Sequence, residues 1–258
     1  MKCIYAVILF PFFLHSCQSR NKKEDALFSM ENITRANLQT ITVEVEDFNF
    51  EDLGNFLEVT SYIQLAAEPL LASIQEIQIK NEKIYIHDKF ARIICYDMQG
   101  KMIFKIDAKG AGPGEYTDVN TFVINEQSRE LIIYDNHKQS LLFYNADNGI
   151  FFKTQKLVKP DPTAMASLGG VYYYDNRYHS NYPNDTDLYY SLLVSKNAMI
   201  MDRHYFPHND AESSYRFRPT RQPFSYNDSV LYYCRNFDNV IYELNPDSLK
   251  ALYKIMLP

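Results

Sequence analysis

The chain has 258 residues, a formal net charge of -6, 22% charged residues and a mean hydropathy of -0.34. These values exclude a polytopic membrane protein and a disordered chain. The acidic balance argues against a nucleic-acid partner, because a phosphate-binding surface needs an excess of Lys and Arg. Tyr (21) and Phe (17) are abundant, and aromatic residues favour β-strands.

The first residues are typical of an export signal. Lys2 is followed by an apolar run from Ile4 to Leu14. A spanning helix needs about 20 apolar residues, whereas the core of a signal peptide needs roughly 7–15. We therefore expect residues 1–16 to be removed from the mature protein.

The end of this leader predicts a lipid anchor. Leu14-His15-Ser16-Cys17 resembles the bacterial lipobox, which implies diacylglycerol on the Cys17 thiol and attachment to a membrane. His15 is an unusual residue at its position in that motif. Several acyl chains at one site give stable anchoring. We expect a lipidated tether over residues 17–40 and an outer-membrane lipoprotein, with the periplasmic and the surface face both left open.

The rest of the chain, residues 41–258, repeats one pattern of strand-like segments separated by turn residues. In each repeat, a β-rich run ends in a polar residue, and a second run follows after a short connection. Gln99-Gly100 and Asn148-Gly149 lie between such runs and favour tight turns. The clearest runs are Ile84–Asp88, Leu131–Asp135, Val171–Asp175 and Val230–Cys234.

The spacing of these repeats predicts a β-propeller. Asp88, Asp135 and Asp175 end three of the runs and lie 47 and 40 residues apart. A four-stranded antiparallel blade needs about 40–50 residues. Adjacent blades cover each other's faces and leave only short edges. The sequence therefore predicts an all-β propeller of four-stranded antiparallel blades, with about four blades visible.

One loop resembles a known family. It contains Gly110, Gly112, Pro113, Gly114, Glu115 and Tyr116, and it is similar to the GxGPGEY loop of the six-bladed, NHL-like propeller lipoproteins of Bacteroidetes. The resemblance implies six blades for a complete ring. Because only about four blades are visible here, we expect an incomplete ring or a ring with fewer blades.

A phosphate-binding role for this glycine-rich loop is not supported. A P-loop needs Lys and then Ser or Thr after its last glycine, and here Glu115 and Tyr116 follow Gly114. Pro113 also removes an amide that an anion would need. We interpret the loop as a structural turn that requires a positive φ.

Two further groups of residues contain side chains that can bind a metal or form a disulfide. Asp202, His204, His208 and Asp210 have ligand-like spacing, but the intervening aromatic residues and proline favour a solvated loop, so we predict no metal and no cofactor. Cys95 and Cys234 both lie in strand-like runs, and we expect them to be unpaired apolar residues rather than a disulfide.

The candidate ligand-binding residues are aromatic and basic. They are Tyr172, Tyr174, Tyr178, Arg216 and Arg218. Aromatic faces near Asn and Asp are suited to sugar recognition, and guanidinium groups bind carboxylates. Packing of the tyrosines and ion pairs of the arginines between blades are the alternative interpretations.

The sequence contains no nucleophile motif. Its main functional prediction is an envelope-anchored binding or scaffold propeller that recognises a peptide, a glycan or a partner protein. The alternative is a propeller enzyme, a lyase or hydrolase, with its site at the mouth of the central channel. A third possibility is the sensor module of a larger signalling protein. The sequence shows no signalling domain, which argues against it.

Overall fold

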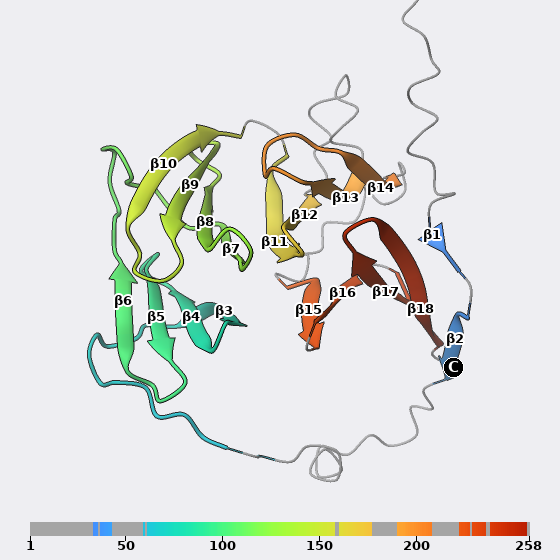
Figure 1. Cartoon of the computed structure of the whole chain (residues 1–258), viewed down its shortest axis with the longest axis horizontal. Helices are drawn as coiled ribbons and strands as arrows, with labels where there is room; N and C mark the ends of the chain where they lie inside the picture. Colours follow the sequence, from blue (N-terminus) through green and yellow to red (C-terminus); the bar gives the residue numbers. More distant parts are fainter. Residues whose placement is uncertain are drawn as a thin grey trace, which may run out of the picture.

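The computed structural model describes residues 33–35, 37–42, 59, 61–157, 160–176, 190–207, 222–227, 229–235 and 238–256. All the regular structure in these ranges is β-strand. The strands form four sheets, and each sheet contains four consecutive antiparallel strands (Figure 1). The all-β propeller predicted from the repeats is confirmed.

The first two sheets follow the repeat pattern of the sequence. Sheet 1 consists of β3 (Ile74–Lys80), β4 (Lys83–Asp88), β5 (Ile93–Asp97) and β6 (Met102–Ile106). Sheet 2 consists of β7 (Thr121–Asn125), β8 (Glu130–Asp135), β9 (Ser140–Asn145) and β10 (Phe151–Lys156). Asn81 and Glu82 both have a positive φ, the backbone twist that suits a two-residue hairpin turn.

The third and fourth sheets complete the set. Sheet 3 consists of β11 (Pro162–Leu168), β12 (Val171–Asn176), β13 (Tyr190–Ser195) and β14 (Arg203–Pro207). Sheet 4 consists of β15 (Phe224–Asn227), β16 (Val230–Cys234), β17 (Val240–Asn245) and β18 (Ser248–Met256).

Two amino-terminal strands extend sheet 4. β1 (Ile33–Thr34) and β2 (Gln39–Thr42) both pair with β18 in parallel. Part of the expected tether over residues 17–40 therefore belongs to the propeller sheet. Pairing between chain segments more than 200 residues apart leaves no local sequence pattern, so the start of the propeller is not visible in the sequence around residues 33–42.

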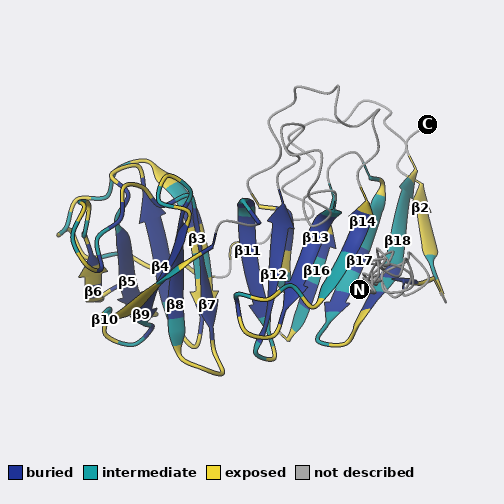
Figure 2. Ribbon diagram, turned by 90° about the horizontal axis from the view of Figure 1, so that it is seen from above, coloured by how far each residue is buried: buried dark blue, intermediate teal, exposed yellow. Residues whose placement is uncertain are grey.

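The four sheets are arranged around a common centre. Their first strands, β3, β7, β11 and β15, face the centre in Figure 1, and Figure 2 shows the strands standing side by side. Three buried apolar clusters fill the spaces between consecutive sheets, from sheet 1 to sheet 4. Burial of apolar surface between sheets is therefore the main source of stability.

The other face of sheet 1 has a different cover. Ile84, Ile86, Ile94 and Tyr96 form a buried cluster there, against Leu65 and Leu71 of the segment that precedes β3. On the same face, Ile77 and Ile79 of β3 remain 50% and 58% exposed. The segment therefore covers the two middle strands, β4 and β5, on this face and leaves the innermost strand, β3, open.

Candidate functional site

The end of the propeller at which β4, β8 and β12 terminate carries the aspartates that mark the repeats, and we call it the anchor end. Asp135 shows what such an aspartate does. It accepts hydrogen bonds from the amides of His137 at 3.0 Å, Lys138 at 3.1 Å and Thr117 at 2.6 Å. The carboxylate thereby ties the end of β8 to the chain that leads into β7.

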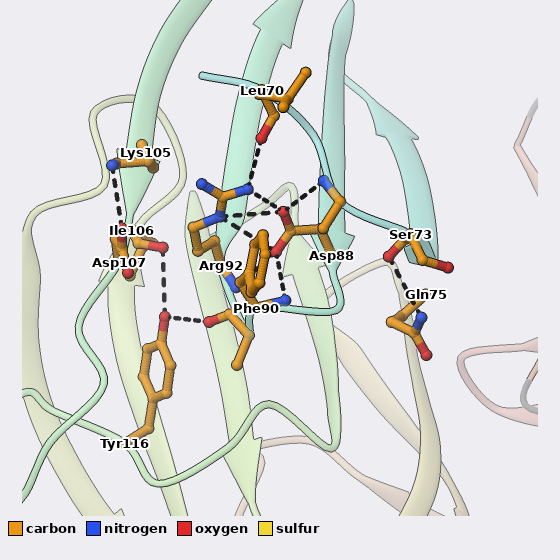
Figure 3. A network of polar contacts seen from close by, with 12 residues as sticks. Leu70, Ser73, Gln75, Asp88, Phe90, Arg92, Lys105, Ile106, Asp107 and Tyr116 are labelled. Carbon is orange, nitrogen blue, oxygen red and sulfur yellow. Dashed lines mark hydrogen bonds and ion pairs between the residues drawn. The ribbon is translucent and has the colours of Figure 1, made fainter. Parts of the chain in front are cut away.

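Asp88 makes the same connection in sheet 1 and adds an ion pair. Its carboxylate accepts the amides of Phe90 at 3.1 Å, Arg92 at 3.3 Å and Ala72 at 3.3 Å, and the Arg92 guanidinium binds it directly (Figure 3). Arg92 also donates to the carbonyl oxygen of Leu70 at 2.9 Å. Burial alone would raise the pKa of Asp88, but the Arg92 side chain and the amides lower it below its ordinary value.

The glycine-rich loop fastens sheet 1 to sheet 2. The Tyr116 side chain is fully buried, and its hydroxyl donates to the carbonyl oxygen of Ala91 at 2.7 Å (Figure 3 shows its second bond, to Ile106). Lys138 donates to the carbonyl oxygens of Gly110 and Glu115 at 2.9 and 2.8 Å. The polar groups of the loop named here are therefore hydrogen-bonded to other parts of the protein.

The loop's own turn is held by one carboxylate and one glycine. The Glu115 side chain accepts the amide of Gly112 at 2.6 Å. Gly114 has a φ of +73°, and a Cβ at this position would lie 2.8 Å from the Phe151 ring. Both the backbone conformation and the close ring therefore require glycine at position 114.

Replacing Gly114 with alanine is expected to destabilise the protein by about 2–3 kcal/mol, from a strained backbone and a displaced Phe151 ring. Gly112→Ala is the matched control, because Gly112 has no positive φ and a Cβ there would meet only the end of the Glu115 side chain, at 3.1 Å. Urea unfolding of both variants measures the difference, and equal losses would contradict the role of Gly114.

The third aspartate has different partners. Asp175 accepts hydrogen bonds from the hydroxyls of Tyr233 at 2.9 Å and Thr163 at 2.5 Å. Burial raises the pKa of Asp175 from 3.8 to about 6, and the two hydroxyls and the nearby Arg235 oppose that rise. A carboxyl group that is neutral under mildly acidic conditions therefore joins sheet 3 to sheet 4.

Further polar groups surround Asp175 at the anchor end. Asn176 is 5% exposed; its Nδ2 donates to the carbonyl oxygen of Tyr190 at 3.2 Å, and its Oδ1 has no hydrogen-bond partner among the residues that the structure describes. Arg235 Nε donates to Ser191 Oγ at 3.1 Å. A buried oxygen of this kind is normally satisfied by a hydrogen-bond donor, so Asn176 marks this strand end as a place to look for one.

Of the five predicted ligand-binding residues, the structure describes two and shows that both are buried. Tyr172 and Tyr174 are 4% and 0% exposed and pack between sheets 2 and 3, so a ligand has no access to their rings. Tyr178, Arg216 and Arg218 lie outside the described residues. The described strands on either side of those residues, β12, β13, β14 and β15, have their near ends at the anchor end.

A second polar group lies at the centre, where the anchor ends of the first strands converge. The Glu76 carboxylate accepts a hydrogen bond from Gln78 at 2.8 Å and also contacts Thr121, Gln222 and the amide of Phe122. Burial raises the pKa of Glu76 from 4.5 to about 7, against the lowering effect of these hydrogen bonds. The hydrogen bonds therefore only partly offset the cost of burying the charged form of this carboxyl.

The opposite end of β3 carries a buried amine. Lys80 is 8% exposed, its Nζ lies 3.3 Å from the centroid of the Tyr226 ring, and Glu126 is its acidic partner at 3.8 Å. Burial lowers the pKa of Lys80, and Glu126 opposes that change. The Tyr226 hydroxyl bonds the backbone of Ser167, so this group links β3, β15 and β11.

Sequence reasoning missed Glu76, Lys80 and their partners. In β3, isoleucines alternate with polar residues, which predicts that the isoleucines face the core. The structure shows the opposite: Glu76 and Lys80 are buried, while Ile77 and Ile79 are exposed. The signal that was available was the position of β3 as the first strand of its repeat, since first strands line the axis.

The structure also describes some of the possible metal ligands and both strand cysteines of the sequence. The His204 ring packs at a tilt against the Tyr190 ring, with 5.2 Å between the ring centroids, and Asp202 accepts a hydrogen bond from the amide of Lys196 at 2.6 Å. His208 and Asp210 fall outside the described residues. In the described part of the chain, no group of three or more His, Cys, Asp or Glu residues could hold a metal ion. Cys95 is a buried free thiol, and Cys234 is an exposed one.

Within the described ranges, no helix has the length and apolar character needed to cross a membrane. A family model described as a domain of unknown function (DUF4934) matches residues 38–257. No curated protein matches the chain.

Among solved structures, a predicted exported protein of Bacteroides fragilis is 18% identical with a TM-score of 0.69, and the match covers 85% of this chain and 60% of that one. BamB of Moraxella catarrhalis is 10% identical with a TM-score of 0.40 (68% and 46% covered). Virginiamycin B lyase of Staphylococcus aureus is 15% identical with a TM-score of 0.43 (70% and 55% covered). The chain thus spans less than two thirds of each of these proteins, and only the first match supports the fold.

Proposed function

The chain belongs to the family described as a domain of unknown function (DUF4934), and on that premise we propose that it is an extracytoplasmic binding propeller. In this proposal, lipid on Cys17 holds the protein at the cell envelope as an outer-membrane lipoprotein. The anchor end over sheets 3 and 4 recognises a peptide, a glycan or a partner protein.

The envelope location is supported by three observations. The leader has the length of an export signal, and Leu14-His15-Ser16-Cys17 resembles a lipobox. The loop from Gly110 to Tyr116 resembles that of the six-bladed Bacteroidetes lipoproteins. The structurally similar Bacteroides fragilis protein is named as an exported protein.

The observation that supports this binding site is the Oδ1 of Asn176, which has no hydrogen-bond partner in the described part of the chain. Asn176 directly follows Asp175, at the strand end from which the chain continues to Tyr178. An acceptor of this kind is satisfied when a ligand or a loop supplies a hydroxyl or an amide. Glycans and peptides carry such donors, and Arg216 and Arg218, in the connection from β14 to β15, are suited to carboxylates.

A second candidate function rests on Glu76. A buried carboxyl with a pKa of about 7 is poised to exchange protons at neutral pH, as a general base or acid must. Its register partner on β4 is His87, which is 6% exposed. A lyase or hydrolase acting at the mouth of the central channel would use this pair, and a glycan or peptide bound there would be converted to products.

Anchoring is tested with Cys17→Ser. We expect the wild-type chain in the membrane fraction and the variant in the soluble fraction, because the thiol is the attachment point for the lipid. Protease treatment of intact cells then distinguishes the surface from the periplasm. Membrane retention of the Cys17→Ser chain would contradict the lipid anchor.

Binding is tested with the soluble Cys17→Ser chain on glycan and peptide arrays. We expect Tyr178→Ala to weaken binding of the ligand found by about tenfold, since stacking on one aromatic ring contributes roughly 0.5–1.5 kcal/mol and its polar neighbours add to this. Tyr62→Ala is the control, because Tyr62 is 90% exposed and precedes sheet 1. Equal binding by both variants would show that Tyr178 is not part of the binding site. Release of cleaved ligand would support the enzymatic function instead of simple binding.

A further inference from the structure

The face of sheet 1 that points away from sheet 2 has less cover than the corresponding faces of the other sheets. Sheet 2 packs on sheet 1, sheet 3 on sheet 2 and sheet 4 on sheet 3, each through a large buried apolar cluster. In the described part of the chain, the cluster on this face of sheet 1 packs instead against Leu65 and Leu71. The difference is clearest in the first strands, since all five residues of β7 are buried and β3 alternates between buried and exposed residues.

Three isoleucines form a row along this face of β3. Ile77 and Ile79 lie directly opposite isoleucines of β4, and residues that lie opposite each other share a face of the sheet. A register shift directly after Ile74 keeps this residue on the same face as the other two. Ile74, Ile77 and Ile79 are 46%, 50% and 58% exposed. Contiguous exposed apolar side chains, unlike single ones, are typical of an interaction surface.

The chemistry of this isoleucine row restricts its partner. The register partners of the row on β4 are Ile84, Ile86 and Asp88, and the Asp88 carboxylate is already paired with Arg92. A charged partner would lose its hydration on this face and would find no counter-charge there. The row therefore fits a second apolar surface.

Sheet 4 also has a face that no other described sheet covers, but that face is polar at its middle. Tyr232, Glu243 and Lys250 lie opposite one another on β16, β17 and β18, and all three are partly exposed. Packing this face on the isoleucine row would bury a carboxylate and an amine between two sheets, which costs more than an apolar contact does. The better match for the isoleucine row is the same row of another copy.

We propose that this face of sheet 1 is the contact surface of a homodimer, in which the isoleucine row of one copy packs on the isoleucine row of a second copy. Because both copies use the same patch, the contact has two-fold symmetry and ends at two chains. It is of the kind that already joins consecutive sheets of the propeller, two apolar sheet faces packed about 10 Å apart. The dimer contact is separate from the ligand site proposed at the anchor end over sheets 3 and 4 and does not depend on it.

Sedimentation equilibrium of the Cys17→Ser chain tests the proposal, at concentrations from about 1 to 100 μM. We expect a monomer–dimer equilibrium without larger species. Ile77→Lys, at the centre of the row, should raise the dissociation constant at least about 100-fold, because each copy then brings an unpaired ammonium group into an apolar contact. Ile79→Lys is a second variant on the same row and should act in the same direction.

Ile150→Lys is the matched control, since Ile150 is 61% exposed and directly precedes the outermost strand of sheet 2, β10. This variant should dimerise as the wild type does. All three replaced side chains are at least half exposed, so the variants should melt close to the wild type by circular dichroism. A monomeric wild type at the highest concentration, a dimer that survives in both Ile77→Lys and Ile79→Lys, an equal loss of dimer in Ile150→Lys, or assemblies larger than a dimer would each overturn the proposal.

Discussion

Asp88→Asn should lower the free energy of unfolding by about 3–5 kcal/mol, the largest loss that we expect from a single isosteric change in this protein. The side chain of Asp88 is 0% exposed and that of its partner Arg92 is 12% exposed. An asparagine leaves the guanidinium charge buried without a counter-charge. It also turns one acceptor oxygen into a donor, which opposes the amides of Ala72, Phe90 and Arg92.

The loss should appear as a fall in the melting temperature of roughly 10 °C, measured by circular dichroism at neutral pH. Asp107→Asn is the matched control: Asp107 also pairs with a basic residue of sheet 1, Lys105, but at the surface, where its side chain is 45% exposed. Such exposed pairs contribute little, so this variant should melt close to the wild type. A similar melting temperature for both variants would show that Asp88 is not what ties the segment before β3 to sheet 1.

The strands and the propeller were predictable because the information for them is local. The blades are recognisable from their alternating or continuous apolar runs and from turn residues such as Gly100 and Gly149, which have a positive φ. In three of the four blades an aspartate also lies at the end of the second strand, at blade spacing. The turn role of the loop from Gly110 to Tyr116 also follows from its sequence, since the steric requirement at Gly114 is local.

The polar centre and the location of the site were not predictable in the same way. The burial of Glu76 and Lys80 depends on where three other sheets stand around β3, and no residue near β3 in the sequence records that arrangement. The tyrosine-rich strand β12 presents the reverse case. Tyr172 and Tyr174 look like a binding surface by composition, yet the neighbouring sheet covers them and their hydroxyls bond Glu130 and the carbonyl oxygen of Ala198.

The pairing of β1 and β2 with β18 belongs to the same class of feature. When a strand joins a sheet from the far end of the chain, closing the long loop between them costs entropy, and the contacts that offset this cost come from the whole fold. Its short sequence, with one buried residue in β1 and none in β2, gives no periodic signal of its own.

Asp175→Asn should raise the free energy of unfolding at high pH, whereas Asp88→Asn lowers it. Because the pKa of Asp175 is about 6 in the folded chain, against 3.8 for the ordinary side chain, the folded state binds the proton more tightly than the unfolded state does. The stability that comes from the neutral carboxyl is complete below about pH 4 and is lost as the pH rises through 6. A difference of about two pKa units corresponds to up to about 3 kcal/mol.

The test is urea unfolding of the wild type and of Asp175→Asn at about pH 4 and pH 8. The asparagine can still accept a hydrogen bond from Tyr233, and the Thr163 hydroxyl retains the Asp175 carbonyl oxygen as an acceptor at 3.2 Å. The variant should therefore match the wild type at the lower pH and be more stable at the higher pH.

A carboxyl with the reverse shift provides the control. Hydrogen bonding and charge from Lys83, with a further contribution from Arg129, lower the pKa of Asp147, so this group stabilises the folded state at high pH and Asp147→Asn should lose stability there. At pH 8 we expect a gain in stability for Asp175→Asn and a loss for Asp147→Asn. This result would show that desolvation governs Asp175 and that charge pairing governs Asp147. A loss of stability in Asp175→Asn at pH 8 would mean that the carboxylate is held in its ionised form, with Arg235 as its effective partner, and that sheets 3 and 4 are joined by an ion pair.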